Sequence, residues 1–224
     1  IKTAYTLAEL GNAYDLGLAS SFKTAFEKLG GTVESGNFPT NQADFTSYIT
    51  NAKNSGAQAI FAPTSISYAQ LIVEAAATQK VGIPLYAGDT WDSNVILQAA
   101  KGKDVTINIT TFYQEGGNQA FDDGFKKWLN ADSSKLTNNG GNDIVSAVSA
   151  MGYDAYFTAL EAIKAADSAE PAKIMEALWK VQYKGVTGDI QFDSVNGDAQ
   201  RTVAYIKAAD TATGAWTFVK EQGI

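Results

Sequence analysis

The chain has 224 residues, 45% of them hydrophobic and 18% charged, which is enough to bury the core of one large domain or of two small ones. The formal net charge of -7, with no cluster of Lys and Arg, argues against nucleic acid as a partner, because binding phosphate groups requires clustered cations. The absence of Cys and His excludes thiol nucleophiles, Ser-His-Asp catalysis and the usual zinc sites, and we expect no cofactor.

The first half of the chain alternates strands with helices. Short runs rich in apolar and β-branched residues predict strands at residues 2–8, 32–38, 59–62, 84–87 and 105–110. Apolar residues at helical spacing lie between these runs. The first helix ends at Gly30, Thr40 or Asn41 caps the second, and the fourth covers residues 92–102. We therefore predict an α/β fold: a flavodoxin-like parallel sheet of order 2-1-3-4-5 with flanking helices on both faces.

Loops with many hydrogen-bonding groups follow the predicted strands one, three and four. The strand order places a switch point between strands one and three, so that residues 9–14 and 63–67 face each other across a crevice. Strand four stops at a turn, residues 88–91, which carries one acid, one hydroxyl and one large aromatic ring. Ligands of open α/β sheets bind at this edge, so these loops form the predicted binding site.

The second half of the chain has a different rhythm. Helices are predicted at residues 121–129, 144–166 and 171–179, with a polar loop at 131–143, and the long middle helix needs burial on more than one side. Residues 185–193 alternate like a strand, and Asn-Gly-Asp at 196–198 predicts a turn. Residues 201–208 and 215–220 form a predicted closing pair of strands. The helices and the turn region have no predicted parallel sheet of their own.

Five short motifs resemble the type I periplasmic solute-binding proteins, and most closely the leucine/isoleucine/valine-binding branch that serves ABC importers. In chain order they are Ala-Tyr-Asp-Leu-Gly-Leu-Ala at residues 13–19, Gly-Asp-Thr-Trp-Asp at 88–92, Gly-Tyr-Asp-Ala at 152–155, Gly-Val-Thr-Gly at 185–188 leading into Phe-Asp at 192–193, and Asn-Gly-Asp at 196–198. Each motif is weak alone, but together they follow the family's order over nearly the whole chain.

The resemblance implies two α/β lobes, joined by three crossovers, that close on a ligand like a clamshell. Residues 1–113 are then one ligand-binding lobe, residues 114–200 are crossover helices and a hairpin of the other lobe, and residues 201–224 are closing strands that return to the first. The sheet of the other lobe is mostly absent from the sequence, which suggests a mature fragment or a cut domain. We expect the face meant for that lobe to promote self-association.

The same resemblance assigns candidate ligand-binding residues to the loops at the sheet edge and to the long helix. Asp89 is the candidate carboxylate for a ligand ammonium group, and Thr90 shares this role because the alignment can slide by one position. The full set is Tyr14, Thr64, Ser65, Ile66, Asp89, Thr90, Trp91 and Tyr153. We expect no catalytic residue and no metal ligand.

Several of these residues also have an ordinary structural interpretation. Asp89 is alternatively a turn acid or a helix N-cap, and Tyr14 is alternatively an aromatic residue packed in the first turn of a helix. Trp91 either stacks on a ligand or covers the strand ends, and Tyr153 sits either at the hinge or in a core. Glu9 is either a solvated loop acid or a reserve partner for an ammonium group.

Three functions remain open. The first is the extracytoplasmic substrate-binding component of an ABC transporter, periplasmic or a cell-surface lipoprotein, which binds a branched-chain amino acid or a similar small polar solute and presents its closed form to a membrane permease. The second is the ligand-binding ectodomain of a sensory receptor. The third, an α/β enzyme, lacks acid and base residues other than carboxylates, Lys and Tyr. The chain contains no apolar run of membrane-spanning length and no signal peptide.

Overall fold

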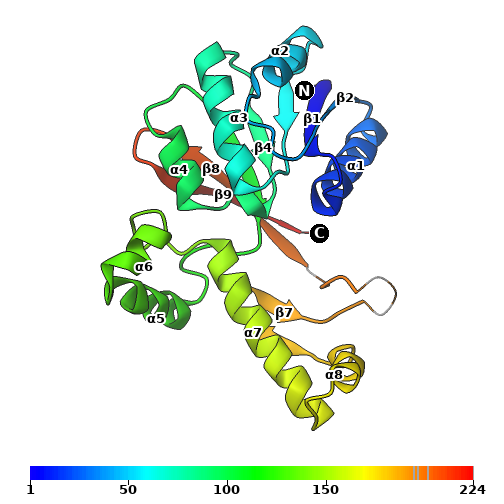
Figure 1. Ribbon diagram of the computed structural model, residues 1–224, viewed down its shortest axis with the longest axis vertical. Coiled ribbons are helices and arrows are strands. Elements are labelled where there is room, and N and C mark those ends of the chain that lie inside the picture. Colours follow the sequence, from blue (N-terminus) through cyan, green and yellow to red (C-terminus); the bar gives the residue numbers. More distant parts are fainter. Residues whose placement is uncertain (194, 196, 201, 224) are drawn as a thin grey trace.

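A mainly parallel sheet organises the computed structural model (Figure 1). The structure describes residues 1–193, 195, 197–200 and 202–223. Within this range, seven strands form one sheet in the order β2-β1-β3-β4-β5-β8-β9. Strands β1 to β5 are parallel, β8 is antiparallel to β5, and β9 is antiparallel to β8. The predicted fold class and the predicted order 2-1-3-4-5 are confirmed.

The strands of this sheet are β1 (Thr3–Glu9), β2 (Thr32–Phe38), β3 (Ala59–Phe61), β4 (Leu85–Ala87), β5 (Ile107–Thr111), β8 (Val203–Asp210) and β9 (Ala215–Gly223). The helices of the first half are α1 (Ala13–Lys28), α2 (Thr46–Asn54), α3 (Ile66–Gln79) and α4 (Asn94–Ala100), and a 3-10 turn, η1 (Asp89–Trp91), lies between β4 and α4. The second half contains α5 (Gln119–Asn130), α6 (Ser133–Asn138), α7 (Ala147–Ala166), α8 (Pro171–Leu178) and a hairpin of β6 (Tyr183–Gly185) and β7 (Gly188–Ile190).

Apolar side chains cover both faces of the sheet. One cluster joins the strands to α2, α3 and α4 and includes the fully buried Phe38, Ile72 and Trp91. On the other face, Phe22 and Phe26 of α1 pack against small residues of the first three strands. Figure 1 shows α1 apart from α2 and α3. Because successive side chains of a strand point to opposite faces, short strands buried on both sides can be apolar throughout.

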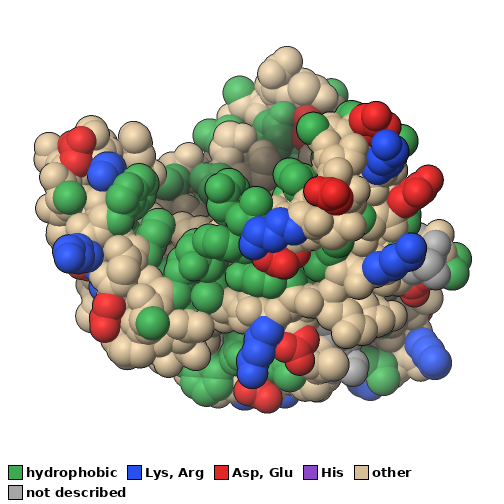
Figure 2. Space-filling view, turned by 90° about the horizontal axis from the view of Figure 1, so that it is seen from below, with side chains coloured by type: hydrophobic (Ala, Val, Ile, Leu, Met, Phe, Trp, Pro, Cys, Tyr) green, Lys and Arg blue, Asp and Glu red, His purple; other side chains and the backbone are tan. Residues whose placement is uncertain are grey.

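Residues 114–193, here called the arm, extend away from the sheet (Figure 1). A small core at the base of the arm contains Val145, Ala147 and Ala150 together with Tyr113, which directly precedes the arm, and Phe121, Phe125 and Val186 pack against it. Many of its large apolar side chains are exposed, and Figure 2 shows hydrophobic side chains gathered around a hollow at this end of the molecule. They include Trp128, Val148, Tyr153, Tyr156, Ile163, Met175 and Trp179. No helix within the described range is long and apolar enough to cross a membrane.

Two predicted helix boundaries in the first half are wrong. Neither Thr40 nor Asn41 caps the second helix. This helix begins at Thr46, whose N–H donates to the side chain of Asp44 at 2.8 Å. The predicted helix at residues 92–102 is preceded by the separate turn η1, and Ser93 caps α4 by accepting from the N–H of Val95 at 3.2 Å. In both places a short polar side chain just before the helix accepts from one of the free N–H groups of its first turn.

Three predictions in the second half also change. Residues 131–143 contain the short helix α6, which Asp132 caps by accepting from the N–H of Ser134 at 2.8 Å. The long helix begins at Ala147 rather than at residue 144. Residues 185–193 do not form one strand, because the chain turns back between β6 and β7. Asn196, in the turn predicted at 196–198, and Arg201, at the start of the first closing strand, lie outside the described residues.

Candidate ligand-binding site

Three loops at the carboxyl edge of the sheet carry most of the candidate ligand-binding residues. Because β1, β3 and β4 are parallel neighbours, the loops that follow them leave the sheet at the same edge. After β1, the side chain of Asn12 caps α1 by accepting from the N–H groups of Tyr14 at 3.1 Å and Asp15 at 3.3 Å. This cap holds Tyr14 in the first turn of the helix, with 39% of the residue exposed.

Tyr14 and Asp89 meet across the edge. The phenol of Tyr14 donates to Oδ1 of Asp89 at 2.5 Å, so the loops after β1 and β4 are in direct contact. Burial and the neighbouring carboxylate raise the pKa of Tyr14, which keeps the phenol protonated as a donor. A Cβ at Gly88 would lie 3.0 Å from the phenol oxygen, so a larger residue there would crowd the pair. The result is a half-buried carboxylate whose orientation is fixed by a charge-assisted hydrogen bond.

The loops after β3 and β4 are joined by a second set of hydrogen bonds. The hydroxyl of Thr90 donates to the backbone carbonyl of Thr64 at 2.9 Å, and the indole N–H of Trp91 donates to the same carbonyl at 3.1 Å. Thr64 and Trp91 are fully buried, whereas Thr90, Ser65 and Ile66 are half-buried. The buried Thr64 and Trp91 thus hold the loops after β3 and β4 together. Ser65, Ile66 and Thr90 lie nearer the surface.

Two acidic residues beside Tyr14 have structural partners. Glu9 accepts from the phenol of Tyr68 at 3.0 Å and from the side chain of Asn12 at 3.3 Å. Hydrogen bonds from Thr40, Tyr68 and Asn12 lower the pKa of Glu9, so this acid is engaged rather than simply solvated. Asp15 is 1% exposed and accepts from the N–H of Glu9 at 3.0 Å, and its burial raises the pKa of its carboxyl.

Tyr153 lies apart from these three loops, on α7. Its ring is 5.0 Å from that of Phe121 and 4.6 Å from that of Phe157, between ring centroids. It also lines a cavity of about 410 Å³ on the arm together with Phe121, Phe125 and Val186. Tyr14 is thus hydrogen-bonded to Asp89, and Thr90 and Trp91 are hydrogen-bonded to Thr64. Within the part of the chain that the structure describes, no hydrogen bond or ring contact joins Tyr153 to them.

Asp154, which the sequence analysis did not single out, holds the hairpin of the arm. It is 1% exposed and accepts from the N–H groups of Val186 and Thr187, both at 2.8 Å, and from the hydroxyl of Thr187 at 2.6 Å. A Cβ at Gly185 would collide with this carboxylate. The Gly-Tyr-Asp-Ala and Gly-Val-Thr-Gly motifs are thus two halves of one contact. In the sequence, Asp154 stands out as an acid within a largely apolar helix, but nothing there identifies the hairpin as its partner.

Comparison with known proteins identifies the family. The sequence model of the periplasmic binding protein family matches residues 1–214, whereas no curated protein matches. The leucine-binding protein LivK of Thermotoga maritima is 26% identical, with a TM-score of 0.76, over 98% of this chain and 60% of its own. A solute-binding protein of R. palustris in complex with benzoate is 17% identical, with a TM-score of 0.79, over 100% of this chain and 60% of its own.

LivJ of Streptococcus pneumoniae, a branched-chain amino acid transporter substrate-binding protein in complex with isoleucine, is 20% identical, with a TM-score of 0.68, over 99% of this chain and 60% of its own. The chain thus spans about 60% of the length of these structures. The family and these matched structures are solute-binding proteins and not enzymes. Because the family model covers nearly the whole sequence, the chain belongs to the periplasmic binding protein family.

Proposed function

We propose that this chain acts within the extracytoplasmic substrate-binding component of an ABC transporter and forms one wall of a cleft for a branched-chain amino acid or a similar small polar solute. The hydrogen bond between Tyr14 and Asp89 supports this proposal most strongly. It brings two loops together at the edge where open α/β sheets bind ligands, and it presents a fixed carboxylate there. A carboxylate in a closed cleft binds an ammonium group strongly and orients it.

The candidate residues take different roles in this proposal. Tyr14, Asp89 and Thr90, with Ser65 and Ile66, contact the solute, since these five are exposed or half-buried. The buried Thr64 and Trp91 hold the loops in place, and Tyr153 contributes from the arm. The proposal also divides the chain: residues 1–113 form the ligand-binding lobe, residues 114–200 belong with a second lobe, and residues 201–224 return to the first.

The matched structures favour an amino acid but leave a second solute class to test. One is a leucine-binding protein and another is in complex with isoleucine, whereas a third is in complex with benzoate. Benzoate carries a carboxylate and no ammonium group, so Asp89 would repel it rather than bind it. The half-buried Asp89 therefore favours a solute that carries a positive charge.

Calorimetric titration tests the proposal with leucine, isoleucine, valine, the other amino acids and benzoate. Two forms are compared: the 224-residue chain, and a form lengthened to match the solved structures and carrying both lobes. We expect tight binding of an amino acid by the two-lobed form and weak or no binding by the shorter chain, which supplies one wall of the cleft. Equal tight binding by both forms, or binding of benzoate alone, would contradict the proposal.

The Asp89→Asn variant of the two-lobed form tests the carboxylate itself. A hydrogen bond to a charged group contributes about 1.5–3 kcal/mol, so we expect affinity for the amino acid to fall about 10- to 100-fold. Asp104→Asn is the matched control, because Asp104 is exposed and precedes β5 at the opposite edge of the sheet. Unchanged affinity in the Asp89 variant would show that another group binds the ammonium.

A further inference from the structure

One buried carboxylate joins the candidate ligand site to the segments that connect the sheet with the arm. Asp92 directly follows η1 and is fully buried. Its Oδ2 atom accepts three hydrogen bonds: from the hydroxyl of Thr111 at 2.7 Å, from the backbone N–H of Ala147 at 3.2 Å and from the ammonium of Lys207 at 2.9 Å. Thr111 ends β5, Ala147 begins α7, and Lys207 lies in β8. The loop that carries Asp89 thus meets three other segments at one atom.

The chemistry of this contact makes it a strong positional constraint. Lys207 is 3% exposed, so both charges of the pair are removed from water. Such a pair adds little net stability, but removing one partner strands a buried charge, so the two groups must stay together. Asp92 also accepts from the first N–H of α7, where the helix dipole favours a negative charge. Any movement of the start of α7 therefore acts on Asp92.

Asp92 is also tied rigidly to the candidate ligand-binding turn. Its backbone N–H donates to the carbonyl of Asp89 at 3.0 Å, which closes the turn that contains Asp89, Thr90 and Trp91. A displacement of Asp89 or Thr90 toward a solute is therefore passed to Asp92 through one tight turn of the backbone.

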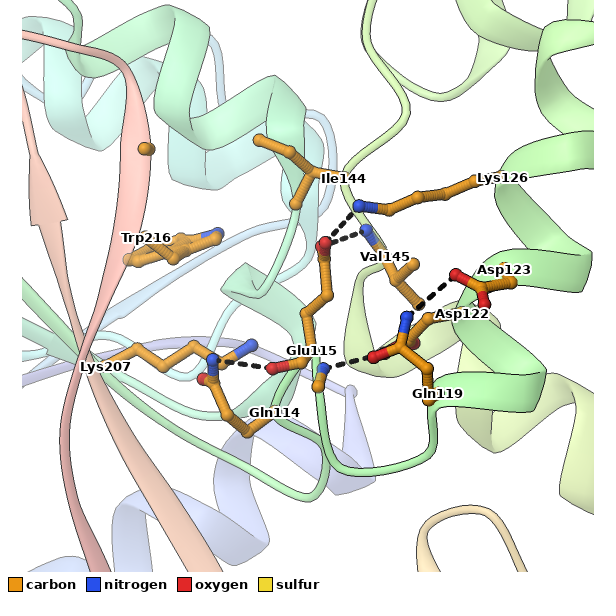
Figure 3. A pocket seen from close by; sticks show the side chains of 12 residues that line it. Gln114, Glu115, Gln119, Asp122, Asp123, Lys126, Ile144, Val145, Lys207 and Trp216 are labelled. Atoms are coloured by element: carbon orange, nitrogen blue, oxygen red, sulfur yellow. Dashed lines mark hydrogen bonds and ion pairs between the residues drawn. The ribbon is translucent and has the colours of Figure 1, made fainter.

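The surroundings of Lys207 leave the arm room to move. A cavity of about 410 Å³ lies between the edge of the sheet and the arm, and Figure 3 shows the side chains that line it. Lys207 and Trp216 line it from the sheet side, and Glu115, Lys126 and Val145 line it from the other side. Glu115 binds Lys126 and the N–H of Val145, so its contacts stay on the arm side of the cavity. The carboxylate of Asp92 therefore spans a junction that is only partly packed.

We propose that Asp92 is a positioning residue that couples the candidate ligand-binding turn to the angle between sheet and arm. This inference rests on the proposed function, because it takes contact with a solute at Asp89 and Thr90 as the event that is transmitted. Binding at the turn shifts Asp92, and Asp92 shifts the start of α7 through the Ala147 hydrogen bond. Conversely, fixing the start of α7 fixes the turn, since coupling between two sites is reciprocal.

Two double variants separate the effect of the hydrogen bonds that Asp92 accepts from the effect of the Asp92–Lys207 charge pair. Asp92→Asn with Lys207→Met removes both charges and keeps an acceptor for Thr111 and Ala147. Asp92→Ala with Lys207→Met removes the same charges and the acceptor. Neither variant strands a buried charge, which guards against simple unfolding. Lys103→Met with Glu74→Gln, an exposed ion pair on the outside of the sheet region, is the control for loss of a charge pair.

The readout is the sheet-to-arm distance, measured between spin labels in the two-lobed form. The chain has no Cys, so labels at Ser47→Cys on α2 and Ala165→Cys on α7, both exposed positions, are specific. We expect the Asp92→Ala double variant to widen the distance distribution and to lower leucine affinity about tenfold, within the usual range of coupling between sites. The Asp92→Asn double variant and the control should keep both properties close to those of the unmodified protein.

Equal distances and affinities in the two double variants would overturn the inference, as would a loss of thermal stability without a change in distance. The distance measurement needs no solute. If leucine does not bind the unmodified protein, the proposed function fails on its ligand, whereas a widened distribution in the Asp92→Ala variant would still support the link between turn and arm.

Discussion

The sheet and the arm differ in how far they bury their large apolar side chains. Where the helices cover the sheet, large residues such as Phe38 of β2 and Phe45 and Ile49 at α2 are at most 1% exposed. In the arm, Tyr156 is 65% and Met175 is 53% exposed. A helix such as α7, apolar on more than one side, needs partners on more than one side. The sheet thus buries its apolar side chains with its own helices, whereas the arm presents an apolar surface suited to a further partner.

Truncation of large side chains should show the largest difference in stability between the two regions. Replacing Phe38 with Ala removes a fully buried ring and should destabilise the protein by about 3–5 kcal/mol. Replacing Tyr156 with Ala on the arm should change stability by about 0.5 kcal/mol or less, because that ring is largely in solvent. Urea unfolding of both variants measures the difference. Similar losses would show that the arm is packed as tightly as the sheet.

The contact of Asp154 with the hairpin should contribute most of the local stability of β6 and β7. Replacing Asp154 with Ala leaves two backbone N–H groups, of Val186 and Thr187, without their acceptor and should cost about 3 kcal/mol. Amide hydrogen exchange should accelerate in β6 and β7 while β1 to β5 stay protected. Asp189→Ala, in the same hairpin but exposed, is the control. Faster exchange throughout the sheet would contradict the independence of the two regions.

The exposed apolar surface of the arm should promote self-association of the 224-residue chain. Light scattering across a range of concentrations is expected to show a rising mean mass. The double variant Tyr156→Lys with Met175→Lys should reduce this effect, whereas Leu29→Lys, an exposed apolar residue 82% accessible beside the sheet, should leave it unchanged. A monomeric mass at every concentration would contradict the prediction that the exposed apolar surface of the arm drives self-association.

Acid should weaken both regions slightly and by the same mechanism. Asp44 lies beside the sheet, Asp132 on the arm and Asp210 at the closing strands. Each accepts hydrogen bonds from residues two or three positions later, which lowers the pKa of its carboxyl. The folded-state pKa lies below the unfolded value of about 3.9, so the stabilising contribution is present above that pH and lost as the pH falls through the folded-state pKa.

Urea unfolding at pH 7 and pH 3 measures this loss. The triple variant with Ala at these three positions should be less stable at pH 7 and should lose less stability on acidification than the unmodified chain. An unchanged difference between the two pH values would show that other carboxylates carry the acid sensitivity.

The sheet could be predicted because its signal is local and repeated. Each short apolar strand is followed by a helix with an apolar stripe, and the rule for parallel sheets then brings the loops of Tyr14 and Asp89 to one edge. The burial of Trp91 could not be predicted, because a ring beside a ligand and a ring beneath a loop look the same in sequence. Helix α6 was missed because six residues carry no apolar periodicity.

Long-range polar contacts account for most of what the sequence could not show. The turn between β6 and β7 depends on Asp154, which lies 32 residues from Val186. The role of Asp92 depends on Lys207, which lies 115 residues away. Nothing near either acid in the sequence marks its partner. Asp154 stands out as an acid within a largely apolar helix, which does not identify its partner, and Asp92 follows a polar turn where an acid is ordinary.

The pairing of β5 with β8 has a mechanical consequence. The chain leaves the sheet at the end of β5 and returns through β8, where Thr111 pairs with Tyr205 on the neighbouring strand. The helices and the hairpin of the arm lie between these two strands, so the two ends of the arm are anchored side by side. Because the arm is attached at two adjacent strands, it can rotate about the line between the attachments with few changes in backbone torsion. A translation of the arm would instead require breaking the hydrogen bonds between β5 and β8. Swivelling is therefore the low-energy motion that this topology builds in.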